Sequence, residues 1–320
     1  MTNQPCIFLM GPTASGKTDL AVSLVKHLPC DIISVDSAMV YQGMNIGTAK
    51  PPADILAIAP HRLIDIRDPL ESYSVGQFCK EALAEIQTIQ SAGRIPLLVG
   101  GTMLYFHSLL QGLSALPPAN AQVRERLNSE AEQIGWQAMH QRLAQIDPQA
   151  AQRIHPNDSQ RIQRALEVYD VSGDSMTAWY NKAKAQGWSA PLVKIVIAPE
   201  QRSVLHVRIA QRFKAMLDQG LIEEVRGLFE RGDLNSELPS MRCVGYRQVW
   251  HHLAGDLSYT DLPEKAIIAT RQMAKRQLTW LRAQKEAYWF DSLSPNLTQQ
   301  VLKLWDKIHI SEQLSVNSYQ

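Results

Sequence analysis

The chain has few cysteines and no long apolar run, and both shortages narrow the class of protein. Its four cysteines, at positions 6, 30, 79 and 243, are scattered, with no C-x-x-C pair and no histidine at a ligand spacing. We therefore expect free or buried thiols in a reducing cytosol, and neither a disulfide framework nor a zinc site. No apolar run approaches the roughly 18 residues of a membrane span, and residues 1–5 lack the features of a signal peptide. The expectation is a cytoplasmic protein with no membrane segment.

The chain also lacks a strong excess of charge of either sign. It has 32 Lys and Arg residues against 31 Asp and Glu, a formal net charge of +1, and hydrophobic residues make up 45% of its 320 positions. Such values are typical of a globular protein with one large domain plus an insertion, or with two domains. A protein that binds nucleic acid through overall basicity would be far more positive. Any contact with a polyanion must therefore come from a local patch of cations.

One glycine-rich segment carries a specific pattern. GPTASGKT matches G-x-x-x-x-G-K-S/T, with an apolar run before it and a helical pattern after it. A phosphate-binding P-loop needs this order, because the glycines let N–H groups surround oxyanions and the helix N-terminus faces them. Lys17 is predicted to reach the outer phosphate, and Thr18 to place its hydroxyl on Mg²⁺. The loop predicts a di- or triphosphate ligand, ATP among the candidates. The predicted phosphate-binding residues are Gly11, Pro12, Thr13, Ala14, Ser15, Gly16, Lys17 and Thr18.

Strand and helix patterns alternate through the first hundred residues. The predicted strands are residues 6–10, 31–35, 61–66 and 95–99. Alternation of this kind predicts a parallel sheet whose ligands lie beyond the carboxyl ends of the strands. The P-loop, Asp36 and Thr102 each follow such an end. We expect all three to converge on one crevice.

The middle of the chain has a different character. Pro117 and Pro118 break the pattern, and from there to about residue 191 the sequence shows helical patterns alone. We therefore predict an α/β fold, a P-loop NTPase-like parallel sheet core with a helical insertion domain. The predicted parts are core residues 1–114, insertion residues 115–191 and core residues 192–320. A long helix is predicted at residues 263–286, a short strand at residues 288–290 and a frayed polar end after residue 311.

Two polar residues at the strand ends have both a structural and a functional interpretation. Asp36 could be a general base, a carboxylate near Mg²⁺, or the cap of the next turn. Bound Mg²⁺ and Lys17 would favour its ionised form, which suits a proton acceptor. Thr102 follows two glycines and is a natural helix N-cap, although those glycines also bring backbone close to any ligand in the crevice. Position alone leaves these interpretations open.

The predicted late helix carries a row of cations. Arg271, Lys275 and Arg282 fall within about 40° of one another at 100° per residue, with Trp280 nearby. Such a face is either a solvated helix surface or a contact for a phosphate backbone. Further positive positions are Arg161, Arg164, Arg242 and Arg247.

Seven segments together resemble the tRNA dimethylallyltransferases, also called tRNA isopentenyltransferases, in their bacterial form. They follow the family's order along nearly the whole chain, so the set is far more specific than the P-loop alone. The segments are GPTASGKT (11–18), DSAMVYQGMNIGTAKP (36–51), HRLIDIRDP (61–69), LLVGGTMLYF (97–106), RIHPNDSQRIQRALEV (153–168), RCVGYRQ (242–248) and ATRQMAKRQLTWLR (269–282).

The resemblance implies transfer of a dimethylallyl group from dimethylallyl diphosphate to N6 of the adenosine 3′ of the anticodon, in tRNAs reading codons that begin with U. It implies three catalytic residues: Asp36 as general base, Thr102 near the reacting centre, and Lys17 on the diphosphate with Thr18 and Mg²⁺. The enzyme is expected to act as a monomer. The implied contacts to the anticodon stem-loop are Asp36, Ser37, Ala38, Met39, Thr102, Arg124, Gln160, Arg161, Ile162, Gln163, Arg164, Arg242, Cys243, Val244, Gly245, Tyr246, Arg247, Lys275, Arg276, Gln277, Leu278, Thr279, Trp280, Leu281 and Arg282.

The chain departs from the family pattern at two positions, and two other functions fit the same residues. Many members have Gln in place of Met39 and Asp in place of Asn45, so a side-chain hydrogen bond from position 39 to a nucleotide is not expected. The first alternative is an ATP-dependent P-loop phosphotransferase acting on a nucleoside or small metabolite, with the insertion as its lid. The second is a tRNA-binding module without catalysis.

Overall fold

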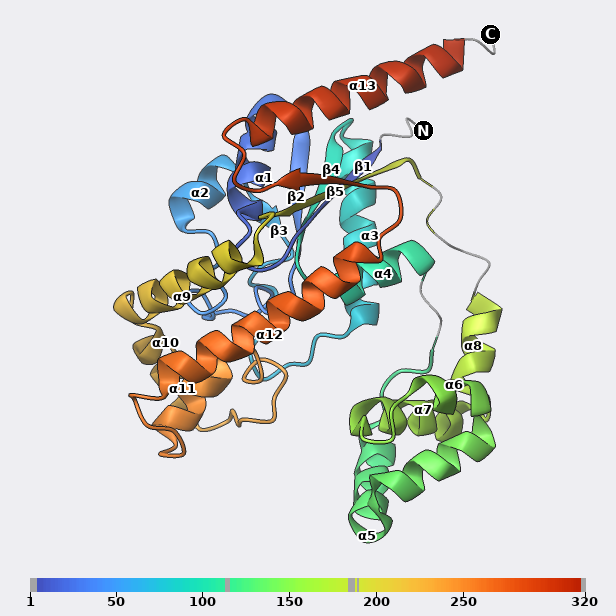
Figure 1. Cartoon of the computed structure of the whole chain (residues 1–320). Coiled ribbons are helices and arrows are strands. Elements are labelled where there is room, and N and C mark those ends of the chain that lie inside the picture. The colour runs from blue at the N-terminus through green and yellow to red at the C-terminus, as the bar shows by residue number, and fades with distance from the viewer. Residues whose placement is uncertain (1–4, 113–115, 184–187, 189, 318–320) are drawn as a thin grey trace. The chain divides into compact units, whose positions relative to one another are not determined.

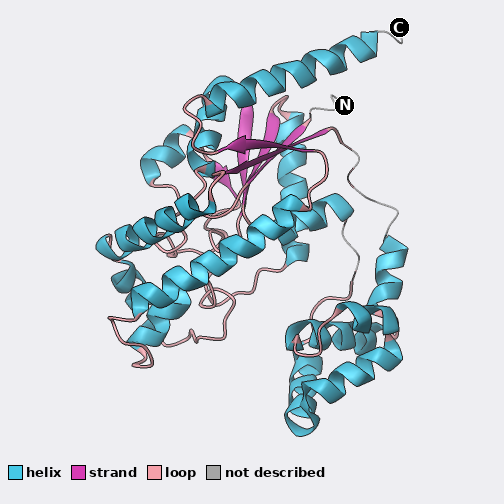
Figure 2. Cartoon of the chain, in the orientation of Figure 1, coloured by secondary structure: helices cyan, strands magenta, loops and turns pink. Residues whose placement is uncertain are grey.

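The computed structural model describes residues 5–112, 116–183, 188 and 190–317, which form two compact units. One unit comprises Met1–Phe106 together with Ala190–Gln320, and the other comprises His107–Ser189. The first holds the sheet and the second is helical (Figure 2). The chain therefore leaves the core and returns to it once.

Six parallel strands form the sheet of the first unit, in the order β3-β2-β4-β1-β5-β6 (Figure 1). The inner strands are buried on both faces, which explains why they are continuous apolar runs and not alternating ones. This arrangement confirms the predicted parallel α/β core. The strands are β1 (Cys6–Met10), β2 (Cys30–Val35), β3 (His61–Arg62), β4 (Ile95–Gly100), β5 (Leu192–Ala198) and β6 (Ala287–Asp291).

Successive strand residues point to opposite faces of the sheet. Since both sets are apolar, helices cover both faces. Ile7 and Leu9 pack in one apolar cluster with helices α1 (Lys17–His27) and α13 (Leu297–Asn317). Phe8 points the other way and contacts Phe106 of α4 (Met103–Gln111), with ring centroids 5.0 Å apart. Helix α3 (Val75–Ser91) lies on that second face, where Phe78 stacks on Tyr105. The shorter α2 (Ala53–Ile58) follows β2.

Four further helices lie between β5 and β6 in sequence. Helix α9 packs against α12, and α10 against α11. Their bounds are α9 (Arg202–Asp218), α10 (Leu221–Phe229), α11 (Tyr246–Leu253) and α12 (Leu262–Arg282).

Three predicted boundaries were wrong. The strand predicted at residues 61–66 is two residues long, because Leu63 and Asp65 have φ of 63° and 53° and turn the chain away. The helix predicted to reach residue 286 ends at Arg282, and Glu286, with φ of 57°, directs the chain into β6. The end predicted to fray after residue 311 is helical to Asn317, as part of α13.

The second unit has an apolar core of its own, built by helices. The described part of this unit contains no strand, as the sequence predicted. Leu127 and Met139 of α5 pack on Ile162 and Leu166 of α7, and all four are fully buried. The helices are α5 (Ala121–Ile146), α6 (Pro148–Arg153), α7 (Ser159–Ser172) and α8 (Met176–Ala183).

The described residues contain neither a bilayer-length apolar helix nor a disulfide. No helix among them combines the length and the apolar character that crossing a membrane requires. Cys6, Cys30 and Cys79 are buried free thiols, and Cys243 is partly buried and free as well. Burial raises the pKa of each of these four thiols to about 12, so they stay protonated near neutral pH.

Candidate active site

The strand register brings three strand ends to the same level of the sheet. Met10 of β1 and Val35 of β2 are both in register with Gly100 of the central strand β4. The residues that follow, Gly11 and Asp36 among them, therefore leave the carboxyl edge of the sheet at the same level, on either side of β4. This is the convergence that the sequence predicted.

The first of these ends is a loop shaped for an anion. Ala14 and Gly16 have left-handed φ values of 61° and 88°, which fold the backbone around its own N–H groups. Gly16 is the N-cap of α1 and makes no side-chain cap, so the helix N-terminus remains open to a negatively charged group. A Cβ at Gly11 would lie 2.5 Å from the Ile197 carbonyl oxygen, so this position requires glycine. The buried Ser15 hydroxyl has no hydrogen-bond partner among the described residues.

Two cations face this loop. Lys17 Nζ donates to the Pro12 carbonyl oxygen at 2.7 Å. Burial and the nearby Arg212 lower the pKa of Lys17 to about 8, and Asp36 opposes that shift. Burial also lowers the pKa of Arg212, against the attraction of Asp36 and Asp19. Arg212 was not predicted from the sequence, because nothing in the pattern of α9 separates this arginine from its neighbours.

The second and third strand ends are hydrogen-bonded to each other. Asp36 Oδ1 accepts from the N–H groups of Ala38 at 2.8 Å and Met39 at 3.2 Å, so the carboxylate caps its own turn. None of the hydrogen bonds among the described residues uses its Oδ2. The Thr102 hydroxyl accepts from the Ser37 N–H at 3.1 Å, and the Thr102 N–H donates to the Val35 carbonyl at 3.2 Å. In the described part of the chain, Asp36 is therefore held in place through Oδ1 alone.

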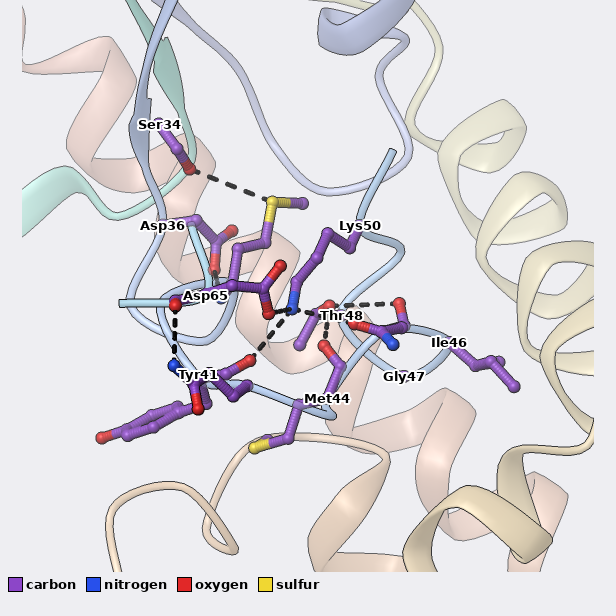
Figure 3. A network of polar contacts seen from close by, with 12 residues as sticks. Ser34, Asp36, Tyr41, Met44, Ile46, Gly47, Thr48, Lys50 and Asp65 are labelled. Carbon is purple, nitrogen blue, oxygen red and sulfur yellow. Dashed lines mark hydrogen bonds and ion pairs between the residues drawn. The ribbon is translucent and has the colours of Figure 1, made fainter. Parts of the chain in front are cut away.

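The loop after Asp36 is stabilised by a polar network around Lys50 (Figure 3). The Lys50 side chain is only 4% exposed and donates to Asp65, to the Tyr41 carbonyl and to Asn45 Oδ1. Asn45 is thus a partner of Lys50. The Met39 sulfur accepts from the Ser34 hydroxyl at 3.9 Å.

A single carboxylate from α10 fixes the far side of the same loop. Glu224 accepts from the N–H groups of Asn45 at 3.0 Å, Ile46 at 2.8 Å and Gly47 at 3.3 Å, and from the Tyr246 hydroxyl. A Cβ at Gly47 would lie 2.4 Å from the Tyr246 ring, so glycine is required there. The sequence did not reveal Glu224, since the backbone groups that it holds lie nearly 180 residues away.

A cavity of about 670 Å³ adjoins this loop. Its wall is apolar along Pro52, Leu56 and Met216, and it carries Lys50 and Arg212 as cations. Arg212 therefore lines the cavity and also lowers the pKa of Lys17 in the P-loop.

The residues of α12 that were predicted to contact tRNA divide into two groups. Lys275, Arg276, Thr279, Trp280 and Arg282 are exposed. Leu281 is fully buried, and Gln277 bonds the main chain at Thr13 and Gly101. Thr13, a predicted phosphate-binding residue, therefore directs its N–H to a protein group.

The other predicted tRNA contacts divide in the same way. Ile162 and Tyr246 are fully buried, so neither residue is accessible to RNA in this structure. Arg161, Gln160, Arg242 and Arg247 are exposed, while Cys243, Val244, Gly245 and Gln163 are partly or fully covered.

All three predicted arginines of the insertion form ion pairs inside their own unit, Arg161 with Asp158 and the other two with one glutamate. Arg124 and Arg164 both bond Glu167, which also accepts from the Asn120 N–H and is fully buried. Burial raises the pKa of Glu167, but these hydrogen bonds outweigh it and hold the pKa below its usual range. The Arg124 pair therefore connects α5 to α7, whereas Arg164 pairs with Glu167 within α7 and donates to the Pro117 carbonyl.

No group of three or more His, Cys, Asp or Glu side chains in the described residues is arranged to hold a metal ion. Thr18 is the second residue of α1, next to the anion loop. A P-loop hydroxyl of this kind binds Mg²⁺ together with phosphate oxygens and needs no carboxylate cluster. The residues present fit such a shared site.

The parallel sheet, the phosphate loop and the inserted helical unit define a P-loop α/β protein, and comparison with known proteins narrows this class. Residues 39–284 match the family model described as IPP transferase. The full-length tRNA isopentenylpyrophosphate transferase of Bacillus halodurans is 36% identical, with 99% of this chain and 100% of that chain covered and a TM-score of 0.71. The chain therefore belongs to the IPP transferase family, and it is a prenyltransferase.

Two other solved structures agree with this assignment. The tRNA delta(2)-isopentenylpyrophosphate transferase of Staphylococcus epidermidis is 33% identical, with 95% of this chain and 99% of that chain covered and a TM-score of 0.68. A eukaryotic dimethylallyltransferase acting on tRNA has a TM-score of 0.83, with 96% of this chain and 80% of that chain covered. At 24% identity the latter supports the fold alone.

Proposed function

We propose that the enzyme transfers a dimethylallyl group from dimethylallyl diphosphate to N6 of the adenosine immediately 3′ of the anticodon, in tRNAs reading codons that begin with U. The observation that carries the proposal is the convergence of an anion loop, two cations and the Asp36 carboxylate at one edge of the sheet. An exocyclic amine is a poor nucleophile, so the reaction needs a stabilised leaving group and a proton acceptor in the same place.

The diphosphate is the leaving group, and the P-loop is where it would bind. Backbone N–H groups around Ala14 and Gly16 would surround its oxygens, with Lys17 and Arg212 opposite them. As the C1–O bond breaks, both electrons go to the diphosphate, and these positive groups stabilise the growing charge. Mg²⁺, held by the Thr18 hydroxyl, would supply further positive charge to the same oxygens.

Asp36 is the proposed general base. Its Oδ1 is held by two backbone N–H groups, which leaves Oδ2 to approach the N6 amine. As the N6–C1 bond forms, the amine loses one proton to this carboxylate, so the products are prenylated adenosine and diphosphate. Thr102 would act through Ser37, whose N–H it holds next to Asp36.

The tRNA must present an unstacked base to this site. Leaving the stack costs a few kcal/mol, which contacts to the flipped base and to the flanking backbone offset. Exposed cations on α12 and on the helical unit are the proposed contacts to that backbone.

Mass spectrometry of tRNA incubated with the protein and dimethylallyl diphosphate tests the proposal. One adenosine, 3′ of the anticodon, should gain a five-carbon unit. Asp36→Asn preserves an oxygen that can cap the turn, and we expect it to lower turnover by about 10²- to 10⁴-fold while tRNA affinity changes little. Asp36→Ala should be equally inactive. If the protein turns over ATP without tRNA and yields no modified nucleoside, it is a phosphotransferase and the proposal is wrong.

A further inference from the structure

Gln277 is a polar side chain of α12 whose amide is bonded at both ends inside the protein. Its Oε1 accepts from the Thr13 N–H at 2.9 Å, and its Nε2 donates to the Gly101 carbonyl at 3.0 Å. Thr13 belongs to the loop that follows β1, and Gly101 to the turn that follows β4. One side chain therefore connects two of the three strand ends that build the site.

The bond to Thr13 reaches the catalytic lysine through one peptide group. The Thr13 N–H and the Pro12 carbonyl belong to the same planar unit, so fixing one fixes the other. The Pro12 carbonyl accepts from Lys17 Nζ at 2.7 Å. Gln277 thus sets the orientation of the peptide plane against which Lys17 is positioned.

The bond to Gly101 reaches the general base through the next residue. Thr102 follows Gly101, and its hydroxyl holds the Ser37 N–H beside Asp36. A Cβ at Gly101 would lie 2.5 Å from Gln277 Nε2, so the bridge requires glycine at this position. Gln277 therefore both packs closely against the turn at Gly101 and bonds to its carbonyl.

We propose that Gln277 is a positioning residue, which holds the diphosphate loop and the turn beside Asp36 at a fixed separation. The inference rests on the proposed function, because it assigns the two connected elements to the leaving group and the base. It also reassigns the residue, since the resemblance implied a tRNA contact. A displacement of about 1 Å between reacting groups can lower the rate about a hundredfold, so a side chain that fixes their separation can have a large effect on turnover.

The substitution Gln277→Met tests the bridge, because methionine has a similar size and makes neither hydrogen bond. Gln272→Met is the matched control, an identical change at an exposed position of the same helix. We expect Gln277→Met to weaken pyrophosphate binding about tenfold, measured by calorimetry without tRNA, and to lower kcat by about tenfold or more. Its tRNA affinity and its KM for tRNA should equal those of wild type, and the control should match wild type throughout.

A loss of tRNA affinity with normal pyrophosphate binding would instead make Gln277 an RNA contact and overturn the inference. Wild-type pyrophosphate binding and kcat in Gln277→Met would overturn it as well. If that variant does not fold, Gly101→Ala decides, because its Cβ displaces the Gln277 amide and should produce the same split between pyrophosphate and tRNA. A Gly101→Ala protein with wild-type behaviour would also overturn it. If the wild-type protein binds pyrophosphate but prenylates no tRNA, the proposed function fails, whereas the pyrophosphate comparison still decides the bridge.

Discussion

At the scale of single residues, the site holds two cations close together before any ligand arrives. Burial and Arg212 lower the pKa of Lys17, while Asp36 on the other side raises it. Such an arrangement costs free energy in the ligand-free protein and is relieved when an anion binds between the cations. The shifted pKa of Lys17 is therefore an electrostatic sign of a site that favours an anion.

This electrostatic coupling predicts a pH dependence. In the ligand-free protein Lys17 loses its proton as the pH rises through about 8, so pyrophosphate affinity should decline above that pH. In Arg212→Ala the repulsion is removed and the pKa of Lys17 rises. We expect weaker binding, by about tenfold at neutral pH, and a decline that begins at higher pH than in wild type. Calorimetric titrations from pH 6.5 to about 9.5 measure both effects.

Protonation of the ligand is the same in both titrations, so the difference between the two curves reports Lys17. Lys214→Ala, an exposed position on the same helix α9, is the control and should follow the wild-type curve. Identical midpoints in Arg212→Ala and wild type would show that the two cations do not interact.

At the scale of elements, the loop at residues 36–52 owes its shape to side chains from distant parts of the chain. It buries the side chains of Val40, Tyr41 and Met44, and three of its backbone N–H groups donate to Glu224 of α10. Lys50 and Asp65 stabilise it from within. Because Asp36 stands at one end of this loop, the contacts that order the loop also limit the motion of Asp36.

We predict that Glu224→Gln destabilises the protein by roughly 1–3 kcal/mol, because an amide cannot accept from all four donors and turns its NH₂ group toward some of them. Tyr246→Phe removes one of the four and should cost about 1 kcal/mol. Urea unfolding of both single variants and the double variant gives the coupling energy. The two effects should be less than additive, whereas full additivity would mean that the hydroxyl and the carboxylate act independently.

Local patterns in the sequence predicted most of the elements and part of the site. The strands, the P-loop and the helical character of the insertion follow from residue spacing over ten or twenty positions. Contacts between distant segments were not predictable, because no local pattern identifies a partner. Arg212, Glu224 and the inward orientation of Gln277 belong to this second kind. The packing of α13 was not predictable for the same reason. Its apolar residues Val301 and Trp305 pack on α1 and on the sheet, which are distant in sequence.

At the scale of the whole molecule, a formal net charge of +1 leaves little long-range attraction for a polyanion. Several of the cations are also neutralised within their own unit, as Arg124 and Arg164 are by Glu167. The cations that remain available to bind tRNA therefore act through local contacts. In the first unit the exposed residues Lys275, Arg276 and Arg282 lie on α12, the helix that also holds the P-loop through Gln277.

Binding through a few local cations predicts a measurable salt dependence. The affinity for tRNA should fall linearly on a log–log plot against salt concentration, because each phosphate contact releases condensed counterions. Lys275→Ala removes one such contact and should make the slope shallower by about one unit, with a uniform loss of affinity across tRNAs. Lys303→Ala removes an equally exposed lysine from α13, on the face of the sheet covered by α1, and should leave the slope unchanged. If the two variants give the same slope, α12 does not contact the phosphate backbone, and the helical unit would have to carry the electrostatic part of tRNA binding.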